Sequence, residues 1–545
     1  MIGGLPLADG ARYAGLFADF NSTFWSGVLR VAEAVVASAP FLVAGVLAAG
    51  FLRGMVGADR VRTLLGVGRR SGPLRAWALG VLLPICSLGA LPVARELRRA
   101  GVPSGTVLSF VLVAPVLNPI SVIYGLAEIV PGTLAYFAAG TFAVYVGIGV
   151  IWNRLVSRGR DDAEAVSDPP LPFGVTRLAV VGETAAKSLV GPAAVDYGLA
   201  LLAVGLLGAF LPHGVLQTGL TRENPLSPVI MGLVAIPAYV TPIEVMMHFA
   251  HIVQDGYSLG AAFALIVLGA GANVGVANWL RREYGVRPLL LFVGLLIGST
   301  LLIGVTADRA IDGGNAGTAD HTHAFDPFTR LSQVSPEQAG VGWVADRIAA
   351  DIRRDEASGT ARIAGLWMIG VLAAAGITLR LLGSRVDARR WALSRGPATG
   401  QGAESAARYD RVLTARQLAA TGVLGVLAAA GVGLYVYYPS PDQLLQEIAQ
   451  IRPDAYSAVR SGDAAEATRR LKQWRSQLRK LPTSVRLRGG SVTEEKTAAV
   501  DETLYAIDTL QDAVSAGRTV ESKLLIRFAE RAHADCGRVL QEDRE

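Results

Sequence analysis

The sequence predicts an all-α fold: a polytopic bundle of membrane helices with two inverted repeats, followed by a C-terminal extramembrane helical bundle. Three observations lead to this prediction. The 545 residues are 51% hydrophobic and 18% charged, whereas soluble domains carry about 25% charged residues. Apolar segments long enough to cross a membrane alternate with arginine-rich loops. The order of these segments also recurs, with a broken or re-entrant helical hairpin in each half.

The composition limits the classes of partner and chemistry. The net charge is +6, but the arginines gather beside apolar segments, where they set orientation in a membrane. We therefore expect the lipid bilayer as a partner and no nucleic acid. Cys86 and Cys536 lie too far apart for a C-x-x-C zinc pattern, and Gly182–Ser188 lacks the glycine that precedes the lysine of a phosphate-binding loop. We predict no cofactor, no metal site and no enzymatic activity.

The first expected span covers residues 25–51, since a crossing needs about 20 apolar residues. Arg30 and Glu33 near its start are three apart and can form an ion pair, which we interpret as interfacial. The arginines between residues 53 and 75 mark a cytoplasmic loop. The N-terminus is therefore expected outside, with the first span as an uncleaved anchor.

The stretch from Pro84 to Pro92 interrupts the next apolar segment with two prolines and a glycine, and Cys86 lies inside it. Proline removes a backbone donor and clashes with the preceding helical turn. Broken backbone at membrane depth must be buried in protein or line a wet cavity. If residues 76–83 and 93–100 formed one crossing, the later arginine clusters would lie outside, so the positive-inside rule favours a re-entrant hairpin.

Two further spans, 105–124 and 134–156, complete repeat 1 (residues 1–156), and a polar cytoplasmic linker (157–191) follows. The order then recurs with the opposite orientation in repeat 2 (residues 192–305). Its expected elements are a span at 197–211, a hairpin of 227–236 and 243–254 broken at Pro237–Pro242, and spans at 259–280 and 288–305.

The internal match between the halves is clearest at an offset of 155 residues. Gly101, Gly105 and Asn118 then fall on Gly256, Gly260 and Asn273. Matching Pro92 to Pro242 needs an offset of 150, so we predict that the second hairpin carries five extra residues. Inverted repeats of this kind place the substrate near the membrane midplane, between the two halves.

The remainder of the chain is expected to begin with an extracytoplasmic loop (306–360). Residues 361–438 would form two additional spans, at 364–382 and 418–438, with an arginine-rich cytoplasmic loop between them, and residues 439–545 an extracytoplasmic helical domain. His321 and His323 in the loop could hold a metal, but we interpret them as solvated. Leucine and alanine at helical spacing predict tail helices near 441–452, 463–481, 492–516 and 519–540. This domain is a candidate for binding a protein partner.

Several polar residues fall within the apolar segments. Asn118 and Pro119 follow Gly105 by about 20 Å of helix, which places them deep in the membrane. An amide beside the carbonyls freed by proline can bind a polar solute. The alternative is that Asn118 and Asn273 only form hydrogen bonds across helices. The Cys86 thiol is a soft ligand that suits a thiophilic solute, although lone buried cysteines are commonly inert. Glu244 and His248 are four residues apart and therefore share one helix face. Ionisable residues inside a membrane segment commonly belong to proton relays.

The stretch from Leu82 to Ile120, LLPICSLGALPVARELRRAGVPSGTVLSFVLVAPVLNPI, resembles the ArsP-type predicted permeases, and Ala39–Gly45 is similar to the family as well. The resemblance covers residues 25–305. It implies a polytopic permease, with efflux of trivalent organoarsenicals as the activity of characterised members. By position it implies that the motif residues are Cys86, Ser87, Pro92, Asn118 and Pro119. Members often have a second cysteine where this chain has Leu88, which argues against a substrate held by several thiols.

Together these observations predict a gradient-driven secondary transporter that works by alternating access and exports a small soft solute such as a trivalent organoarsenical. Cys86, Ser87 and Asn118 would face residues of the second half, namely Tyr239, Thr241, Glu244 and Asn273, while Glu244 with His248 would couple protons. We expect a multi-pass inner-membrane protein with the N-terminus and the C-terminal domain extracytoplasmic. Two alternatives are a signalling or assembly module that acts through its C-terminal domain, and a passive channel.

Overall fold

The computed structural model describes residues 8–67, 70–129, 131–156, 176–310, 324–331, 340–354, 356–383 and 438–541, with isolated positions between 420 and 435. In these residues the regular structure is helical, apart from one isolated bridge between Thr221 and Tyr257. The prediction of an all-α fold is therefore confirmed for this part of the chain. The chain divides into two compact units, of which the second contains the last four helices.

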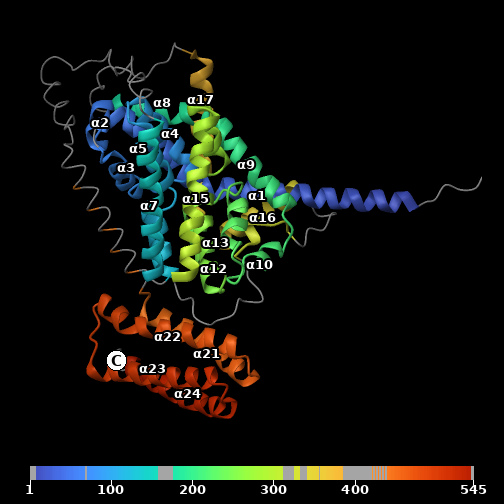
Figure 1. The fold of residues 1–545 in the computed structure, drawn as a ribbon, viewed down its shortest axis with the longest axis vertical. Helices are drawn as coiled ribbons and strands as arrows, with labels where there is room; N and C mark the ends of the chain where they lie inside the picture. The colour runs from blue at the N-terminus through green and yellow to red at the C-terminus, as the bar shows by residue number, and fades with distance from the viewer. Residues whose placement is uncertain are drawn as a thin grey trace, which may run out of the picture. The chain divides into compact units, whose positions relative to one another are not determined.

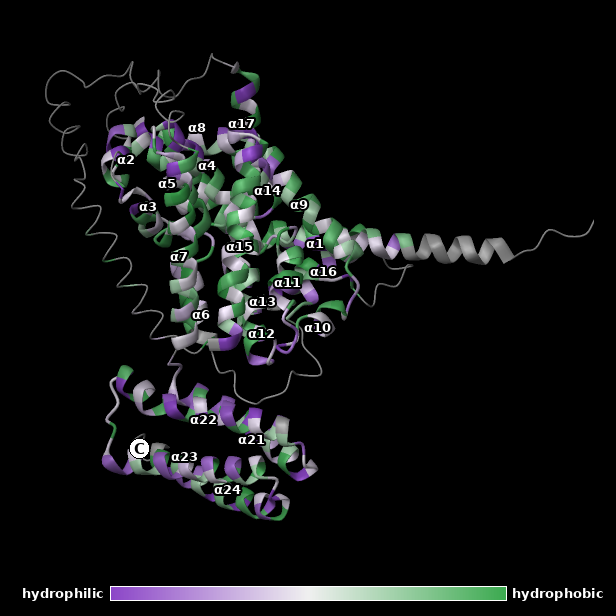
Figure 2. Ribbon diagram, viewed as in Figure 1, coloured by the Kyte–Doolittle hydropathy of each residue, from purple (hydrophilic) through white to green (hydrophobic). Residues whose placement is uncertain are grey.

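Among the described residues of the first unit, five helices are long and apolar enough to cross a membrane (Figure 1). They are α1 (Ala8–Phe51) with its π-helical extension η1 (Leu52–Val56), α7 (Pro131–Leu155), α9 (Ala193–Phe210), α15 (Val286–Ala310) and α17 (Glu356–Leu381). Figure 2 shows hydrophobic residues along the length of α7 and α15. The expected span at 418–438 and the pair His321 and His323 lie outside the described residues.

The first half of the unit contains a series of shorter helices. These are α2 (Ala58–Leu65), α3 (Gly72–Val81), α4 (Ser87–Arg99), α5 (Ser104–Val113) and α6 (Pro119–Glu128). The predicted break is present between Val81 and Ser87, but Pro92 lies inside α4, so the prediction that the break extends to Pro92 is wrong. Cys86 caps the helix by accepting the Gly89 N–H, and helix formation therefore begins before Pro92 is reached.

The second half repeats this series with α10 (Val215–Gly219), α11 (Ser227–Ala235), α12 (Pro242–Gln254), α13 (Leu259–Ala264) with η3 (Leu265–Ala270), and α14 (Val274–Tyr284). The break before Pro242 lies where we expected it. Helix α12 begins at Pro242 itself, because proline is tolerated at the first helical position. The span expected at 259–280 is bent, since the chain turns by 53° between Ala270 and Val274. Asn273 causes the restart by accepting the N–H groups of Gly275 and Val276.

The span expected at 105–124 is interrupted in the same way, between α5 and α6. Pro115 and Pro119 each remove a helical donor there. Within the segment expected to be a polar linker, residues 176–189 form helix α8 (Thr176–Leu189), which packs against α1 and α17. Within the expected outer loop, α16 (Val341–Arg354) is also helical.

Equivalent contacts in the two halves follow one constant offset of 155 residues. The Gly105 N–H donates to Asn153 Oδ1 at 2.8 Å, and the Gly260 N–H donates to Asp308 Oδ1 at 3.1 Å. A Cβ on Gly105 would meet the Gly149 carbonyl at 2.2 Å, and one on Gly260 would meet the Gly304 carbonyl at 2.6 Å. In both halves, therefore, small residues allow two helix backbones to touch.

The breaks obey the same offset. Cys86 and Thr241 cap α4 and α12, and Asn118 and Asn273 precede α6 and α14. The prediction of five extra residues in the second hairpin is therefore wrong. It rested on matching Pro92 with Pro242, but Pro92 is the sixth residue of its helix and Pro242 is the first.

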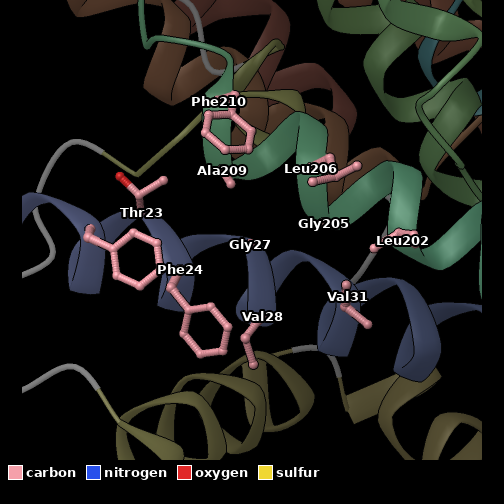
Figure 3. Close-up of a pocket in the computed structure, with 11 residues that line it drawn as sticks. Thr23, Phe24, Gly27, Val28, Val31, Leu202, Gly205, Leu206, Ala209 and Phe210 are labelled. Atoms are coloured by element: carbon pink, nitrogen blue, oxygen red, sulfur yellow. The ribbon is translucent and has the colours of Figure 1, made fainter.

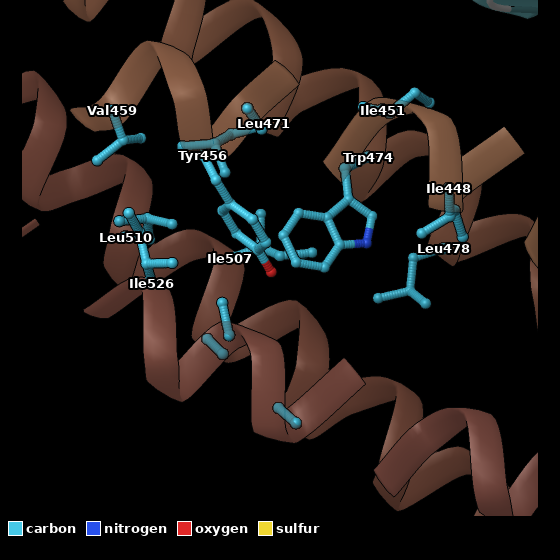
Figure 4. Packing of buried hydrophobic residues seen from close by; sticks show 14 of the residues in the cluster. Ile448, Ile451, Tyr456, Val459, Leu471, Trp474, Leu478, Ile507, Leu510 and Ile526 are labelled. Atoms are coloured by element: carbon cyan, nitrogen blue, oxygen red, sulfur yellow. The ribbon is translucent and has the colours of Figure 1, made fainter. Parts of the chain in front are cut away.

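The second unit contains α21 (Pro441–Ser461), α22 (Ala464–Leu487), α23 (Glu494–Ser515) and α24 (Thr519–Gln541). Their inward faces share a core that includes Tyr456, Trp474, Leu478 and Leu510 (Figure 4). The first two helices extend well past the expected 441–452 and 463–481, because Pro453 and Pro482 lie inside them without ending them.

His533 and Cys536 are both buried in this second core. Burial lowers the pKa of His533 to about 4 and raises the pKa of Cys536 to about 11, because the charged form of each would lose its hydration. The His533 ring packs edge-on against Trp474 at 5.7 Å. Both residues thus act as neutral core groups in this unit.

Candidate functional site

The two halves of the first unit meet directly at the N-termini of α4 and α14. Cys86 is fully buried, and its Sγ accepts the Gly89 N–H at 3.3 Å. The next side chain, Ser87, accepts a hydrogen bond at 2.6 Å from the Asn273 amide, 186 residues away in the sequence. Ser87 and Asn273 are at most 1% exposed. The structure therefore brings together three of the residues predicted for the site.

Helix α1 approaches this point closely because two glycines face one another. A Cβ on Gly45 would lie 2.2 Å from the Gly89 carbonyl oxygen, so only glycine allows the two backbones to pack at this distance. The contact holds the first turn of α4 against α1, where Ser38 is buried.

Tyr239 comes from the break between α11 and α12 in the second half. Its buried hydroxyl lies beside the Cys86 thiol and the Ser38 hydroxyl, but it forms no hydrogen bond of normal geometry. A buried polar group without such a bond costs about 1–3 kcal/mol. The thiol and this hydroxyl therefore lie together, both buried, at the junction of the two halves.

Asn118 lies in the break between α5 and α6 with its side chain fully buried, and Pro119 is the first residue of α6. Its amide donates to the Ala114 carbonyl at 3.1 Å, and its carbonyl accepts the Ser121 N–H at 3.0 Å. These bonds close the backbone around the break, which is the role that Asn273 also performs before α14. Pro92 is buried within α4.

Glu244 and His248 line a small cavity between α1, α9 and α12. Its other lining residues include Arg30, Glu33, Tyr239 and Phe328. The Glu244 carboxylate accepts the Thr241 backbone N–H at 2.9 Å and the Thr241 hydroxyl at 2.8 Å. The His248 ring packs on Phe328 at 5.3 Å, and its Nδ1 has no hydrogen-bond partner. The proposed proton pair therefore shares one enclosed space, while His251 is exposed.

The cavity volume is about 40 Å³. A water molecule needs about 10–15 Å³ measured in this way, so the space holds a few waters and no solute of the size of methylarsenite.

Arg30 and Glu33 form the ion pair expected from their spacing, at 2.8 Å. Arg30 is only 8% exposed, and it also donates to the backbone carbonyls of Asp326 and Thr329 at 2.5 and 3.2 Å. The segment 324–331 is further held by hydrogen bonds from Arg330 to Ser22 and to the Leu211 carbonyl. This segment, which we call the strap, closes the cavity near the C-terminal end of α9.

A second set of contacts, which sequence reasoning missed, closes the other end of α9. Asp196 is fully buried and accepts hydrogen bonds from Arg95 at 3.0 Å, Arg282 at 2.5 Å and Asn278 at 2.7 Å. We call this group the Asp196 network; it joins α4, α9 and α14. The available signal was a single carboxylate at the start of the apolar segment 193–210.

A larger hollow of about 630 Å³ lies between α1 and α9, but its lining is apolar (Figure 3). Phe24, Val28, Leu206 and Phe210 are among its residues, and Thr23 supplies the only hydroxyl. Because it offers no buried polar group, we do not assign a solute to it.

Among the described residues, no group of three or more histidine, cysteine, aspartate or glutamate side chains could hold a metal ion.

Comparison with known proteins identifies the first unit. The sequence model of the ArsP_1 family, described as predicted permeases, matches residues 26–308. The chain belongs to this permease family. The family resemblance seen in the sequence is thereby confirmed. Family membership and the apolar helices together show a multi-pass membrane permease. Such a protein has the lipid bilayer and a small-molecule substrate as its partners.

Two relatives of this permease illustrate how far the similarity extends. The UPF0718 protein YcgR of Bacillus subtilis is 26% identical over 307 residues, which cover 53% of this chain and 98% of that protein. A putative two-component membrane permease complex subunit of Streptococcus mutans is 28% identical over 86 residues, covering 16% of this chain and 29% of that protein. No solved structure matches the permease.

Proposed function

We propose that this permease is a gradient-driven secondary transporter that exports a small soft solute such as a trivalent organoarsenical. The observation that carries the proposal is the junction of the two halves at Cys86, where a buried thiol lies beside the unsatisfied hydroxyl of Tyr239. Thiol sulfur is a soft ligand and favours soft, thiophilic centres over hard oxygen-liganded ions. Ser87 and Asn273 position the thiol by joining the two helix starts.

The proposal includes two inverted repeats, 1–156 and 192–305, separated by the segment 157–191. Their support is the offset of 155 residues, which relates the glycine contacts and helix caps of one half to those of the other. Transporters built in this way place the solute at broken helices between the repeats. Cys86, Ser87, Asn273 and Tyr239 lie at such breaks, with Thr241 capping the neighbouring helix.

Alternating access then requires one closure on each side of the site. We assign these closures to the Asp196 network and the strap, which lie near opposite ends of α9. The 18 residues of α9 span about 27 Å at 1.5 Å per residue, close to the thickness of a bilayer core. The positive-inside rule places the arginine-rich Asp196 network on the cytoplasmic side and the strap outside.

This orientation places the N-terminus and the unit of α21–α24 outside the inner membrane, as an extracytoplasmic bundle that can bind a protein partner. Residues 306–360 and 361–438 would connect the permease repeats to this bundle. The caps of its helices and its own core support folding in an aqueous compartment.

Proton coupling is assigned to Glu244 and His248, because they share the enclosed cavity with the Arg30–Glu33 pair. Ionisable groups inside membrane proteins commonly form such relays. The test is uptake of methylarsenite into everted membrane vesicles with and without an imposed proton gradient. We expect the gradient to raise the wild-type uptake rate on the order of tenfold, and Glu244→Gln to remove that increase while retaining slow downhill uptake.

Glu223→Gln is the matched control, since Glu223 is an exposed carboxylate between α10 and α11, outside that cavity. Gradient-stimulated uptake should persist in the control. Equal uptake by wild-type vesicles and vesicles without the protein would contradict the proposed function, and stimulation that survives Glu244→Gln would contradict the proton assignment alone.

A further inference from the structure

The second unit exposes apolar side chains on one side of its bundle. Helices α23 and α24 pack together as one layer, and α21 and α22 form the other (Figure 1). Val520, Leu524 and Phe528 on α24 are 75%, 66% and 36% exposed, and their spacing of four residues places them in one row along the helix. Tyr505 on α23 is 67% exposed. Within the described part of these four helices, the one other large hydrophobic side chain exposed to this degree is Leu487, on α22.

The apolar row of α24 and Tyr505 lie on adjoining parts of the two helices. The Thr503 hydroxyl of α23 donates to the Ala532 carbonyl of α24 at 3.0 Å. This bond fixes the register of the antiparallel pair and brings Tyr505 near the level of Phe528. Glu530 lies beside α21, so the opposite edge of α24, which carries Phe528, is turned toward α23. We call this surface the α23–α24 face; a contiguous exposed apolar surface of this kind marks an interaction site.

The charges on the α23–α24 face are divided between its two helices. Apart from one buried lysine, every charged residue of α23 is a carboxylate, and Asp501 and Glu502 are exposed on it. On α24 a row of exposed basic residues, Lys523, Arg527 and Arg531, runs next to the apolar row. No ion pair among the described residues engages any of these five side chains.

A second copy of this chain satisfies both features at once. Because α23 and α24 are antiparallel neighbours, a two-fold rotation about an axis perpendicular to the face places α24 of each copy over α23 of the other. The basic row of each copy then meets the carboxylates of its partner, and the apolar side chains close on one another. Two-fold dimers with such self-complementary surfaces are the commonest protein oligomers. A lipid surface or a partner of one charge sign would attract one helix of the face and repel the other.

We propose that the α23–α24 face is a dimer interface, through which two copies of this permease associate by their second units. Burial of the apolar row supplies the driving force, and the divided charges set the orientation of the copies. Two copies held in one membrane meet at a raised effective concentration, so a modest affinity is enough. The inference depends neither on the proposed solute nor on proton coupling.

The experiment measures the dimer dissociation constant of the full-length protein in a neutral detergent, by light scattering and sedimentation over a range of concentrations. Arg527→Glu with Arg531→Glu makes both helices of the face acidic, and Asp501→Lys with Glu502→Lys makes both basic. We expect concentration-dependent dimers for the wild type. Each double variant should weaken self-association on the order of a hundredfold, because like charges would face one another.

Mixing the two double variants separates a lost interface from a lost fold. An acidic face then meets a basic face at both reciprocal contacts of the two-fold arrangement. The mixture should therefore form heterodimers with an affinity within about tenfold of the wild type, although neither variant pairs with itself. Variants that had only failed to fold would not recover association in this way.

Leu524→Gln tests the apolar row and should raise the dissociation constant about tenfold. Two controls change the other layer of the bundle: Leu487→Gln removes its exposed leucine, and Lys472→Glu with Arg479→Glu reverses two exposed charges on α22. Both should change the constant less than about twofold.

The proposal is overturned if the wild type stays monomeric up to about 100 μM, which would leave a different protein as the occupant of the face. It is equally overturned if all variants dimerise as the wild type does, or if the two double variants do not pair when mixed.

Discussion

If the proposed function holds, the wild-type permease protects a sensitive bacterial host against methylarsenite, and we expect the Cys86→Ser variant to lose all of that protection. Serine has nearly the same shape and can still cap α4, so the fold should be retained. A hydroxyl is a harder ligand than a thiol and binds trivalent arsenic weakly. The half-inhibitory concentration should therefore fall to that of the empty vector, and cellular arsenic should rise accordingly.

Cys536→Ser is the matched control, because Cys536 is the other cysteine of the chain and is equally buried, in the core of the second unit. Its host should survive as the wild type does. Full protection by Cys86→Ser, with equal amounts of protein in the membrane, would show that the thiol is dispensable. The assignment of a soft solute would then fail.

Asp196→Asn should produce the largest loss of stability among single substitutions in the first unit. Asparagine preserves the shape but leaves Arg95 and Arg282 without their shared carboxylate. Breaking a buried pair by removing one partner costs about 3–5 kcal/mol; because both arginine side chains are about one-third exposed, we expect a value near 2–3 kcal/mol.

The measurement is the thermal unfolding midpoint in detergent, with trypsin cleavage as a second readout. We expect the midpoint to fall by about 5 °C or more and cleavage near α4 to accelerate. Asp59→Asn removes a carboxylate whose side chain is fully exposed in its weak pair with Arg62 and should leave both readouts unchanged. Wild-type behaviour of Asp196→Asn would mean that the network does not hold this end closed.

The helix breaks were predictable because local chemistry determines them. Proline disfavours the interior of a helix because it removes a backbone donor and clashes with the preceding turn, and the breaks before Ser87 and Pro242 follow from sequence alone. The extent of a break depends on capping, which is why the break ends before Pro92. The same holds in the second unit, where Pro453 and Pro482 are carried inside longer helices by packing on the shared core.

The arrangement of the site was only partly predictable. Cys86, Ser87 and Asn118 were expected to face Tyr239, Thr241, Glu244 and Asn273. The structure places Ser87 against Asn273 and Tyr239 beside Cys86. Their direct contact, between Ser87 and Asn273, joins residues 186 positions apart, and no local pattern specifies such a pair. Asp196 was missed because its partners come from two distant helices. Arg30 was interpreted as interfacial because no local pattern indicates that the strap covers it.

The most direct test of the account is the access of Cys86 to each side of the membrane. In a Cys536→Ser chain, Cys86 is the remaining thiol, and a membrane-impermeant maleimide can be added to everted or right-side-out vesicles. Alternating access predicts labelling from either side during turnover, slower labelling with saturating methylarsenite, and faster labelling from the cytoplasmic side in Asp196→Asn. A thiol that is labelled from neither side, in the wild type or in Asp196→Asn, would contradict the placement of the transport site at Cys86.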